Sequence, residues 1–213
     1  MRRVLHIVLT AVLFTGCVQN NDLTVANSTD ISTLDPFGMF SRIEVAFGDH
    51  LYQSLTFFND DMEVEPLLAT SWERLEGDTT WTFHLREGVQ FHNGEVFDAS
   101  VVKYSIEEYY TRNEAGQMVG GASVAVPSAD IIQVDIVDPY TVNITTNGPK
   151  ALLPFYLSQM WMIEPGFYRG TTDAERAEQV MGTGPYVVKE RIRDSHLTLA
   201  ANTNYWGATP KMD

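Results

Sequence analysis

The clearest pattern of apolar and polar positions in the chain lies between residues 81 and 110. Large apolar side chains alternate with polar ones over residues 81–86, which is the two-residue period of a half-buried strand. Alternation resumes over residues 89–97, where Asn93-Gly94 predicts a tight hairpin turn with two positive φ angles. Asp98 then stands at the position of a helix N-cap. The apolar residues after Asp98 have helical spacing and predict one apolar face: Val102, Ile106 and Tyr109 or Tyr110.

Weaker patterns predict further strands and helices on both sides of this stretch. Residues 131–137 and 140–145 alternate on either side of the turn-forming pair Asp138-Pro139, which predicts a second hairpin. Shorter strand patterns occur at 23–27, 56–58 and 197–199. Helical patterns occur at 43–55 and 168–181. Strands and helices that are mixed along the chain in this way predict an α/β fold of the mixed α+β kind.

The first residues of the chain have the organisation of a targeting segment. Arg2-Arg3 precedes an apolar run over residues 4–14. That run is shorter than the roughly 20 residues that a membrane-spanning helix needs, so we expect a signal peptide over residues 1–16. The sole cysteine, Cys17, follows directly, and the run Phe-Thr-Gly-Cys resembles a bacterial lipobox. This resemblance implies that Cys17 carries a lipid anchor; the alternative is an ordinary signal peptide followed by an incidental cysteine.

Composition narrows the class of protein and the kinds of partner. The 213 residues are 44% hydrophobic and 11% aromatic, which is enough for a packed core. The formal net charge of −14 repels phosphate groups, so we expect neither nucleic acid nor anionic lipid headgroups as partners. A single cysteine excludes an internal disulfide framework and a metal site with several cysteines.

The sequence has no motif of a common catalytic site. It lacks a G-x-S-x-G elbow, an H-E-x-x-H pair and a GK[ST] phosphate loop. The glycine-rich residues 116–123 lack the lysine that a phosphate loop needs. His84 and His92 have a turn between them and do not have the spacing of metal ligands on one element. We therefore expect no enzyme activity, no metal site and no cofactor.

One long stretch resembles a known family. Residues 81–107 read W-T-F-H-L-R-E-G-V-Q-F-H-N-G-E-V-F-D-A-S-V-V-K-Y-S-I-E. They resemble the signature of family 5 solute-binding proteins, the extracytoplasmic peptide/nickel-type receptors of ABC importers. Val96 departs from the family's usual proline at that position. Six more segments resemble motifs of the family, in the same order along the chain: 33–36, 51–55, 65–73, 131–145, 182–186 and 204–213.

The resemblance implies a periplasmic-binding-protein-like fold of type II, with two lobes, of which this chain is an N-terminal portion. The expected fold is therefore incomplete, with part of the first lobe and an inserted β-rich subdomain. The expected divisions of the chain are a signal peptide at 1–16, a lipidated cysteine and polar tether at 17–22, a first-lobe segment at 23–50, an inserted α+β subdomain with hairpins at 51–168, and a return to the first lobe at 169–213.

The resemblance also implies a function. A family 5 protein captures a solute outside the cytoplasmic membrane and delivers it to ABC permease subunits. We expect a short peptide as the solute, a monomeric protein, and a location in the periplasm or cell envelope with a lipid anchor in a membrane. A nickel chelate, haem or an oligosaccharide are alternative solutes, and an envelope receptor or chaperone without a transport role is an alternative function.

Candidate solute contacts follow from the same resemblance. In the family, the loop after the Leu34-Asp35-Pro36 motif runs along the ligand cleft, and the helix after the 81–97 stretch ends near the cleft mouth. Trp161 stands between two methionines, which is a composition that suits either an adaptable ligand surface or a plain core. The candidate residues are Met39, Phe40, Ser41, Arg42, Tyr109, Tyr110 and Trp161.

Overall fold

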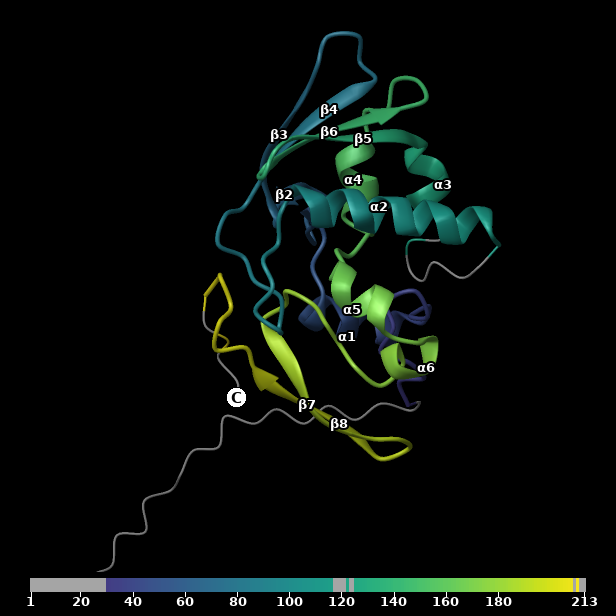
Figure 1. The fold of residues 1–213 in the computed structure, drawn as a ribbon, viewed down its shortest axis with the longest axis vertical. Helices are drawn as coiled ribbons and strands as arrows, with labels where there is room; N and C mark the ends of the chain where they lie inside the picture. The colour runs from purple at the N-terminus through teal and green to yellow at the C-terminus, as the bar shows by residue number, and fades with distance from the viewer. Residues whose placement is uncertain (1–29, 117–121, 123–124, 209, 211–213) are drawn as a thin grey trace, which may run out of the picture.

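The computed structural model describes residues 30–116, 122, 125–208 and 210. In Figure 1 its upper part is a sheet with helices against one face, and its lower part holds short helices and a two-stranded hairpin. The expectation of a mixed α+β fold is confirmed. The expected signal peptide, Cys17, the tether and the strand at 23–27 lie outside the described residues. Within them, no helix has both the length and the apolar composition that a membrane crossing requires.

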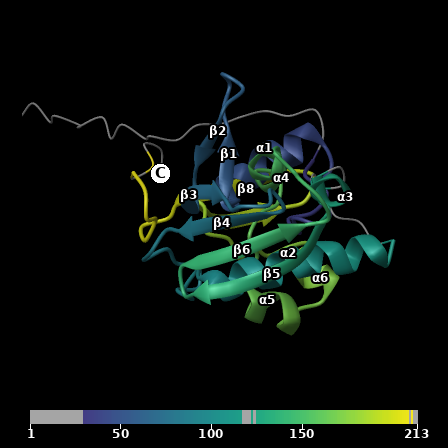
Figure 2. The same ribbon diagram turned by 90° about the horizontal axis from the view of Figure 1, so that it is seen from above.

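A four-stranded antiparallel sheet forms the upper part, in the order β3-β4-β6-β5. Its strands are β3 (Ala69–Arg74), β4 (Thr80–Leu85), β6 (Thr141–Thr146) and β5 (Ile131–Asp138). Figure 2 shows the four strands side by side. Phe83 of β4 is opposite both Trp72 and Val142, so these apolar side chains share the inner face of the sheet. The predicted strand at 81–86 and the hairpin of 131–145 are confirmed.

Helix α2 (Ala99–Glu114) covers that inner face and lies against β5 and β6. The predicted cap is confirmed, because Asp98 Oδ1 accepts hydrogen bonds from the backbone N–H of Ser100 at 2.8 Å and Val101 at 3.3 Å. Two short helices, α3 (Ala125–Ala129) and α4 (Leu153–Leu157), complete the layer. The predicted apolar face of α2 is buried at Val102, Ile106 and Tyr109.

The prediction for the turn at Asn93-Gly94 was wrong in its geometry. Gly94 has a φ of 87°, but Asn93 is not among the described residues with positive φ. The Asn93 side chain instead accepts a hydrogen bond from the backbone N–H of Glu95 at 3.0 Å, which stabilises a turn that needs only one positive φ angle. The segment remains a hairpin, although only Gln90 and Val96 form a β-bridge.

Helix α1 (Arg42–Leu51) is shorter than the predicted helix at 43–55. Tyr52 is extended, with φ −115° and ψ 158°, and its hydroxyl donates to the carbonyl of Leu34 at 3.0 Å. The apolar pattern after residue 51 therefore comes from tertiary packing and is not the face of a helix. The chain continues into a short hairpin of β1 (Thr56–Phe58) and β2 (Val64–Pro66), which confirms the predicted strand at 56–58.

The helical pattern predicted at 168–181 is divided in the structure. It forms two helices, α5 (Pro165–Gly170) and α6 (Asp173–Arg176), because a capping box at Thr172 begins a new helix. The chain then enters the hairpin of β7 (Tyr186–Ile192) and β8 (His196–Ala201), which confirms the strand predicted at 197–199. Strand β7 lies against α1. An apolar cluster of the lower part includes Ile31, Leu34, Met39, Leu51, Tyr52 and Trp161.

The end of α1 and the segment that leads into β7 cross each other at very short distance. The backbone N–H of Gly184 donates to the carbonyl of Leu51 at 3.0 Å, at the end of α1. A Cβ atom at Gly182 would lie 2.0 Å from the Leu51 oxygen, and one at Gly184 would lie 2.4 Å from the His50 oxygen. Glycine is therefore required at both positions, because two backbones approach too closely for any side chain.

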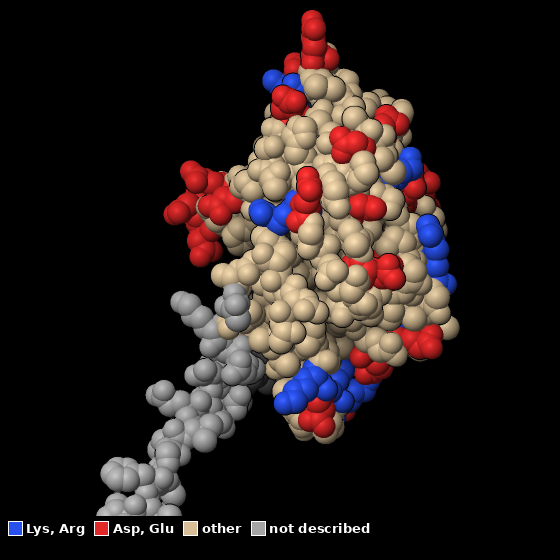
Figure 3. Space-filling view, turned by 60° about the vertical axis from the view of Figure 1, so that its left-hand side comes forward, with Lys and Arg blue, Asp and Glu red and all other residues tan. Residues whose placement is uncertain are grey.

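Charge is distributed unevenly over the surface. Figure 3 shows acidic side chains over much of one face and basic side chains gathered at its lower end, where Figure 1 places the β7–β8 hairpin. Both arginines of this hairpin, Arg191 and Arg193, form ion pairs with Glu178. Basic and acidic side chains therefore pair locally at the lower end, although the protein as a whole has a net charge of −14.

Candidate functional site

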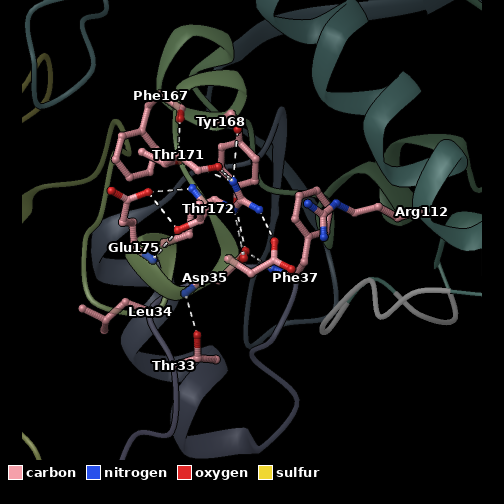
Figure 4. Close-up of polar contacts among 12 residues, drawn as sticks. Thr33, Leu34, Asp35, Phe37, Arg112, Phe167, Tyr168, Thr171, Thr172 and Glu175 are labelled. Carbon is pink, nitrogen blue, oxygen red and sulfur yellow. Dashed lines mark hydrogen bonds and ion pairs between the residues drawn. The ribbon is translucent and has the colours of Figure 1, made fainter.

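The loop between Asp35 and Ser41 leads into α1 and contains the first candidate residues. Asp35 fixes its beginning. The carboxylate oxygen Oδ1 accepts hydrogen bonds from the backbone N–H of Phe37 at 3.0 Å and the hydroxyl of Tyr168 at 2.8 Å, and Oδ2 accepts from Arg176 Nε at 3.3 Å. Figure 4 shows Asp35 among these partners, which come from the loop, from α5 (Pro165–Gly170) and from α6 (Asp173–Arg176). The start of the loop is thus attached to a distant part of the sequence.

Arg176 completes this buried cluster. Its guanidinium also donates to the carbonyl of Tyr168 at 3.1 Å, to the carbonyl of Thr171 and to the carboxylate of Asp173. Burial is the largest single effect and would lower the pKa of Arg176, but the charge and hydrogen bond of Asp35, together with Tyr168 and Asp173, outweigh it and raise that pKa above its ordinary value. The guanidinium is therefore charged, and every one of its nitrogens has a partner.

Glu44 holds the other end of the loop. Its carboxylate accepts hydrogen bonds from the backbone N–H groups of Phe40 at 3.2 Å, Ser41 at 3.0 Å and Ser32 at 3.1 Å, and from the Ser32 hydroxyl at 2.5 Å. Burial alone would raise the pKa of Glu44, but these hydrogen bonds together lower it to about 2. Ser41 and Glu44 also form the capping box of α1.

Phe37 anchors the middle of the loop in the interior. Its ring makes edge contacts with Tyr109 at 4.7 Å and Tyr168 at 5.5 Å between ring centroids. The guanidinium of Arg112, from the last turn of α2, lies 4.2 Å from the Phe37 ring centroid, which is a cation–π contact. The loop is therefore held by two carboxylates at its ends and by one aromatic side chain between them.

The structure divides the predicted contact residues into two groups. Met39, Tyr109 and Trp161 are 0%, 1% and 6% exposed and pack against other apolar side chains. The Trp161 indole stacks on Tyr52 and donates to Asp49 Oδ1 at 3.0 Å. Phe40, by contrast, is 46% exposed, and its two neighbours at the start of α1 are exposed as well: Ser41 and Arg42.

Tyr110 lies apart from the loop. Its hydroxyl donates to the carbonyl of Val126 at 2.7 Å and accepts from the backbone N–H of Ile131 at 2.7 Å. These bonds tie α2 to α3 and to the start of β5. The structure therefore brings Met39, Phe40, Ser41 and Arg42 together on one loop, with Tyr109 behind it.

Sequence reasoning missed the polar residues that hold the loop. Glu44 had a readable signal, because Ser41 and Glu44 have the spacing of a capping box. Arg176 had no readable signal in the sequence, because its partner Asp35 lies 141 positions earlier in the chain. Among the residues that the structure describes, no three histidine, cysteine, aspartate or glutamate side chains are placed to hold a metal ion together.

An open groove of about 420 Å³ lies elsewhere, beside β7. It is lined by His92, Glu178, Gln179, Val180, Val187 and Val188. Burial lowers the pKa of His92, and the Gly184 carbonyl, 3.3 Å from its Nε2, acts in the opposite direction and only partly offsets burial. None of the seven candidate residues lines this groove.

Similarity to a solved structure identifies the class of protein to which this fold belongs. The structure is similar to the ABC transporter-associated periplasmic binding protein DppA from Helicobacter pylori, solved in complex with the peptide STSA, with a TM-score of 0.74 and 26% identity. The match covers 87% of this chain and 40% of that one. The fold is therefore that of the type II periplasmic binding proteins, as the sequence predicted.

The family follows from the sequence match. Residues 63–213 match the family model described as bacterial extracellular solute-binding proteins, family 5, middle part, and the chain belongs to this family. It is 30% identical to the uncharacterized protein YhjP of Bacillus subtilis (strain 168), over 86% of this chain and 29% of that protein. It is 25% identical to the nickel-binding periplasmic protein of Escherichia coli (strain K12), over 99% of this chain. The chain spans 29% and 40% of the lengths of these two relatives.

Proposed function

We propose that the protein is the substrate-binding component of an ABC importer, which captures short peptides outside the cytoplasmic membrane and delivers them to permease subunits. The observation that carries this proposal is the match of residues 63–213 to family 5. Peptide is favoured as the solute because the similar DppA structure contains one. Binding leaves the solute chemically unchanged, so the protein is not an enzyme in this proposal. It acts as a monomer.

The loop before α1 supplies the contacts in this proposal. Phe40 offers exposed apolar surface, and Ser41 and Arg42 offer a hydroxyl and a cation beside it. An arginine can hold a peptide carboxylate by two parallel hydrogen bonds. Met39, Tyr109 and Trp161 form the buried support behind these groups, and Tyr110 connects that support to the sheet. Two ends held by Asp35 and Glu44 keep the loop ordered before a solute arrives, which lowers the entropic cost of binding.

The same proposal divides the chain between the first lobe and an inserted subdomain. Residues 23–50 and 169–213 belong to the first lobe, and residues 51–168 form the inserted subdomain. The assignment is supported by the packing of β7 against α1, which joins the early and late segments. It is also supported by the four-stranded sheet and α2, which lie wholly within 51–168.

The location of the protein follows from its first residues and from its relatives. The E. coli relative is a periplasmic protein. We place this protein in the periplasm or cell envelope, with residues 1–16 as signal peptide and Cys17 as the lipidated residue that anchors residues 17–22 to a membrane. The acyl chains of such an anchor each add about 0.8 kcal/mol of membrane affinity per buried CH₂ group.

Calorimetry tests the peptide assignment. The full-length protein is titrated with tetra-alanine and, separately, with nickel(II) and L-histidine, and the peptide is recovered for mass spectrometry. We expect saturable heat with tetra-alanine and recovery of the intact peptide. Heat with nickel–histidine alone would replace the peptide by a metal chelate, and cleaved peptide would contradict a pure binding role. Absence of heat with both probes would contradict solute capture.

A matched pair of variants tests the loop. Arg42→Ala is expected to weaken tetra-alanine binding about tenfold, the loss of one hydrogen bond to a charged group. Arg74→Ala is the control, because Arg74 is an exposed arginine on β3 that pairs with Asp78. Equal affinities of the two variants would contradict the role of Arg42.

A further inference from the structure

Behind the loop lies a buried cluster of polar and charged side chains. Asp35, Tyr168 and Arg176 are 7%, 5% and 5% exposed, and the structure leaves none of their buried polar atoms without a partner. Removing two charges from water costs several kcal/mol per ion, and apolar side chains of similar volume are often at least as stabilising. The presence of a charged pair here calls for a reason other than stability.

The cluster joins three segments that are far apart in the sequence. Asp35 belongs to the loop, Tyr168 to α5 and Arg176 to α6. The next residue, Ala177, accepts a hydrogen bond at its carbonyl from the backbone N–H of Leu34 at 2.9 Å. The same carbonyl accepts from Arg191 Nη1 at 2.5 Å. The start of the loop is therefore fixed to the segment through which the chain returns to the β7–β8 hairpin.

The hydrogen bonds have a direction that an apolar contact lacks. Oδ2 of the Asp35 carboxylate accepts from Arg176, and Oδ1 accepts from both the hydroxyl of Tyr168 and the backbone N–H of Phe37. Its orientation thus sets the backbone direction at Phe37, three residues before the exposed Phe40. An ion pair whose hydrogen bonds are all satisfied allows only one orientation of that carboxylate.

We infer that Tyr168 and Arg176 are positioning residues, which act through Asp35 to hold the loop of residues 36–41 in its solute-binding conformation. This inference rests on the proposed function of the loop. Neither residue needs to touch the solute. Loss of the Tyr168 hydroxyl leaves its ring in place against Phe37 but removes one of the two hydrogen bonds to Asp35 Oδ1, so the loop samples more conformations and binds more weakly.

The test combines hydrogen exchange and binding in the full-length protein. In Tyr168→Phe, amide exchange of residues 37–41 is expected to accelerate about tenfold, the effect of one lost buried hydrogen bond. Exchange in the sheet is expected to stay unchanged. The affinity for tetra-alanine is expected to fall by a similar factor. Asp35→Asn is expected to show the same local effect, because it keeps the size of the side chain and removes its charge.

Tyr205→Phe is the matched control. The Tyr205 hydroxyl accepts from Gln53 Nε2 at 3.0 Å, so this variant also loses one hydroxyl contact, but away from the loop. Unchanged exchange over residues 37–41 in Tyr168→Phe would overturn the inference. Equal acceleration across the whole protein would also overturn it, because the cluster would then be purely structural. If the wild-type protein does not bind tetra-alanine, the peptide proposal fails while the exchange measurement still decides this inference.

Discussion

Arg176 Nε lies 3.3 Å from Asp35 Oδ2, although 141 positions separate the two residues. Both side chains are buried, so removal of one partner leaves the other charge in the interior without compensation. We expect Arg176→Met to lower the free energy of unfolding by about 3–5 kcal/mol. Urea unfolding, followed by circular dichroism, measures this loss.

A double variant is the control for this prediction. Asp35→Asn combined with Arg176→Met removes both charges, so the destabilisation is expected to be smaller than the sum for the two single variants. Coupling of at least about 1 kcal/mol would be the signature of a direct pair. Additive losses would show that the two residues stabilise the protein independently.

Gly182 has no room for a side chain. Its Cβ would lie 2.0 Å from the carbonyl oxygen of Leu51, and backbone cannot move aside as a flexible side chain can. Gly182→Ala is therefore expected to destabilise the protein by about 3 kcal/mol. Gly170→Ala is the control, because nothing lies within 4 Å of the corresponding position. Thermal unfolding compares the two, and a similar melting temperature for both variants would contradict the close crossing.

The lowered pKa of the Glu44 carboxylate makes the free energy of unfolding depend on pH. Its pKa is lowered from 4.5 to about 2 in the folded protein, so the unfolded chain binds the proton more readily. The resulting stabilisation is complete above pH 4.5 and is lost as the pH falls from 4.5 towards 2. Glu44→Gln is expected to reduce the free energy of unfolding at pH 7 by about 2 kcal/mol.

Stability curves of the wild type and of Glu44→Gln between pH 7 and pH 3 check this prediction. The difference between the two proteins is expected to shrink below pH 4.5, because the Glu44 carboxyl of the unfolded wild-type chain then binds a proton while that of the folded protein stays ionised until about pH 2. Glu76→Gln is the control for a general charge effect, since Glu76 is exposed in a turn. A difference that stays constant with pH would contradict the role of the ionised carboxylate.

The proposed lipid anchor depends on one atom, the sulfur of Cys17. Cells that express Cys17→Ala and are grown with labelled palmitate are expected to yield unlabelled protein, since this is the sole cysteine in the chain. Val18→Ala retains the cysteine and is expected to keep the label. A label that persists in Cys17→Ala would show that the lipid, if any, is attached elsewhere.

Local chemistry explains which elements could be predicted. The N-cap at Asp98 and the hairpin of β5 and β6 depend on residues close together in the sequence, and both were predicted correctly. The end of α1 was misplaced because Tyr52 and Leu55 continue a helical spacing while packing into different surroundings. Periodicity records that a residue is buried, but it does not record which element buries it.

The candidate site shows the same limit. A family resemblance pointed to Met39 and its neighbours, and only the structure separates the buried Met39 from the exposed Phe40. The residues that hold the loop were not predicted. Glu44 acts through a local capping pattern that is visible in the sequence, whereas Arg176 acts across the fold.

The sequence by itself determined the class of fold, the family and most of the local elements, because strand alternation, capping residues and turn residues act within a few positions of one another. Only the tertiary structure decided how the loop before α1 is held. The pairing of Asp35 with Arg176 and the contact of Gly182 with Leu51 join residues more than 100 positions apart. Such contacts depend on how packed elements meet in space, which no local pattern of residues specifies.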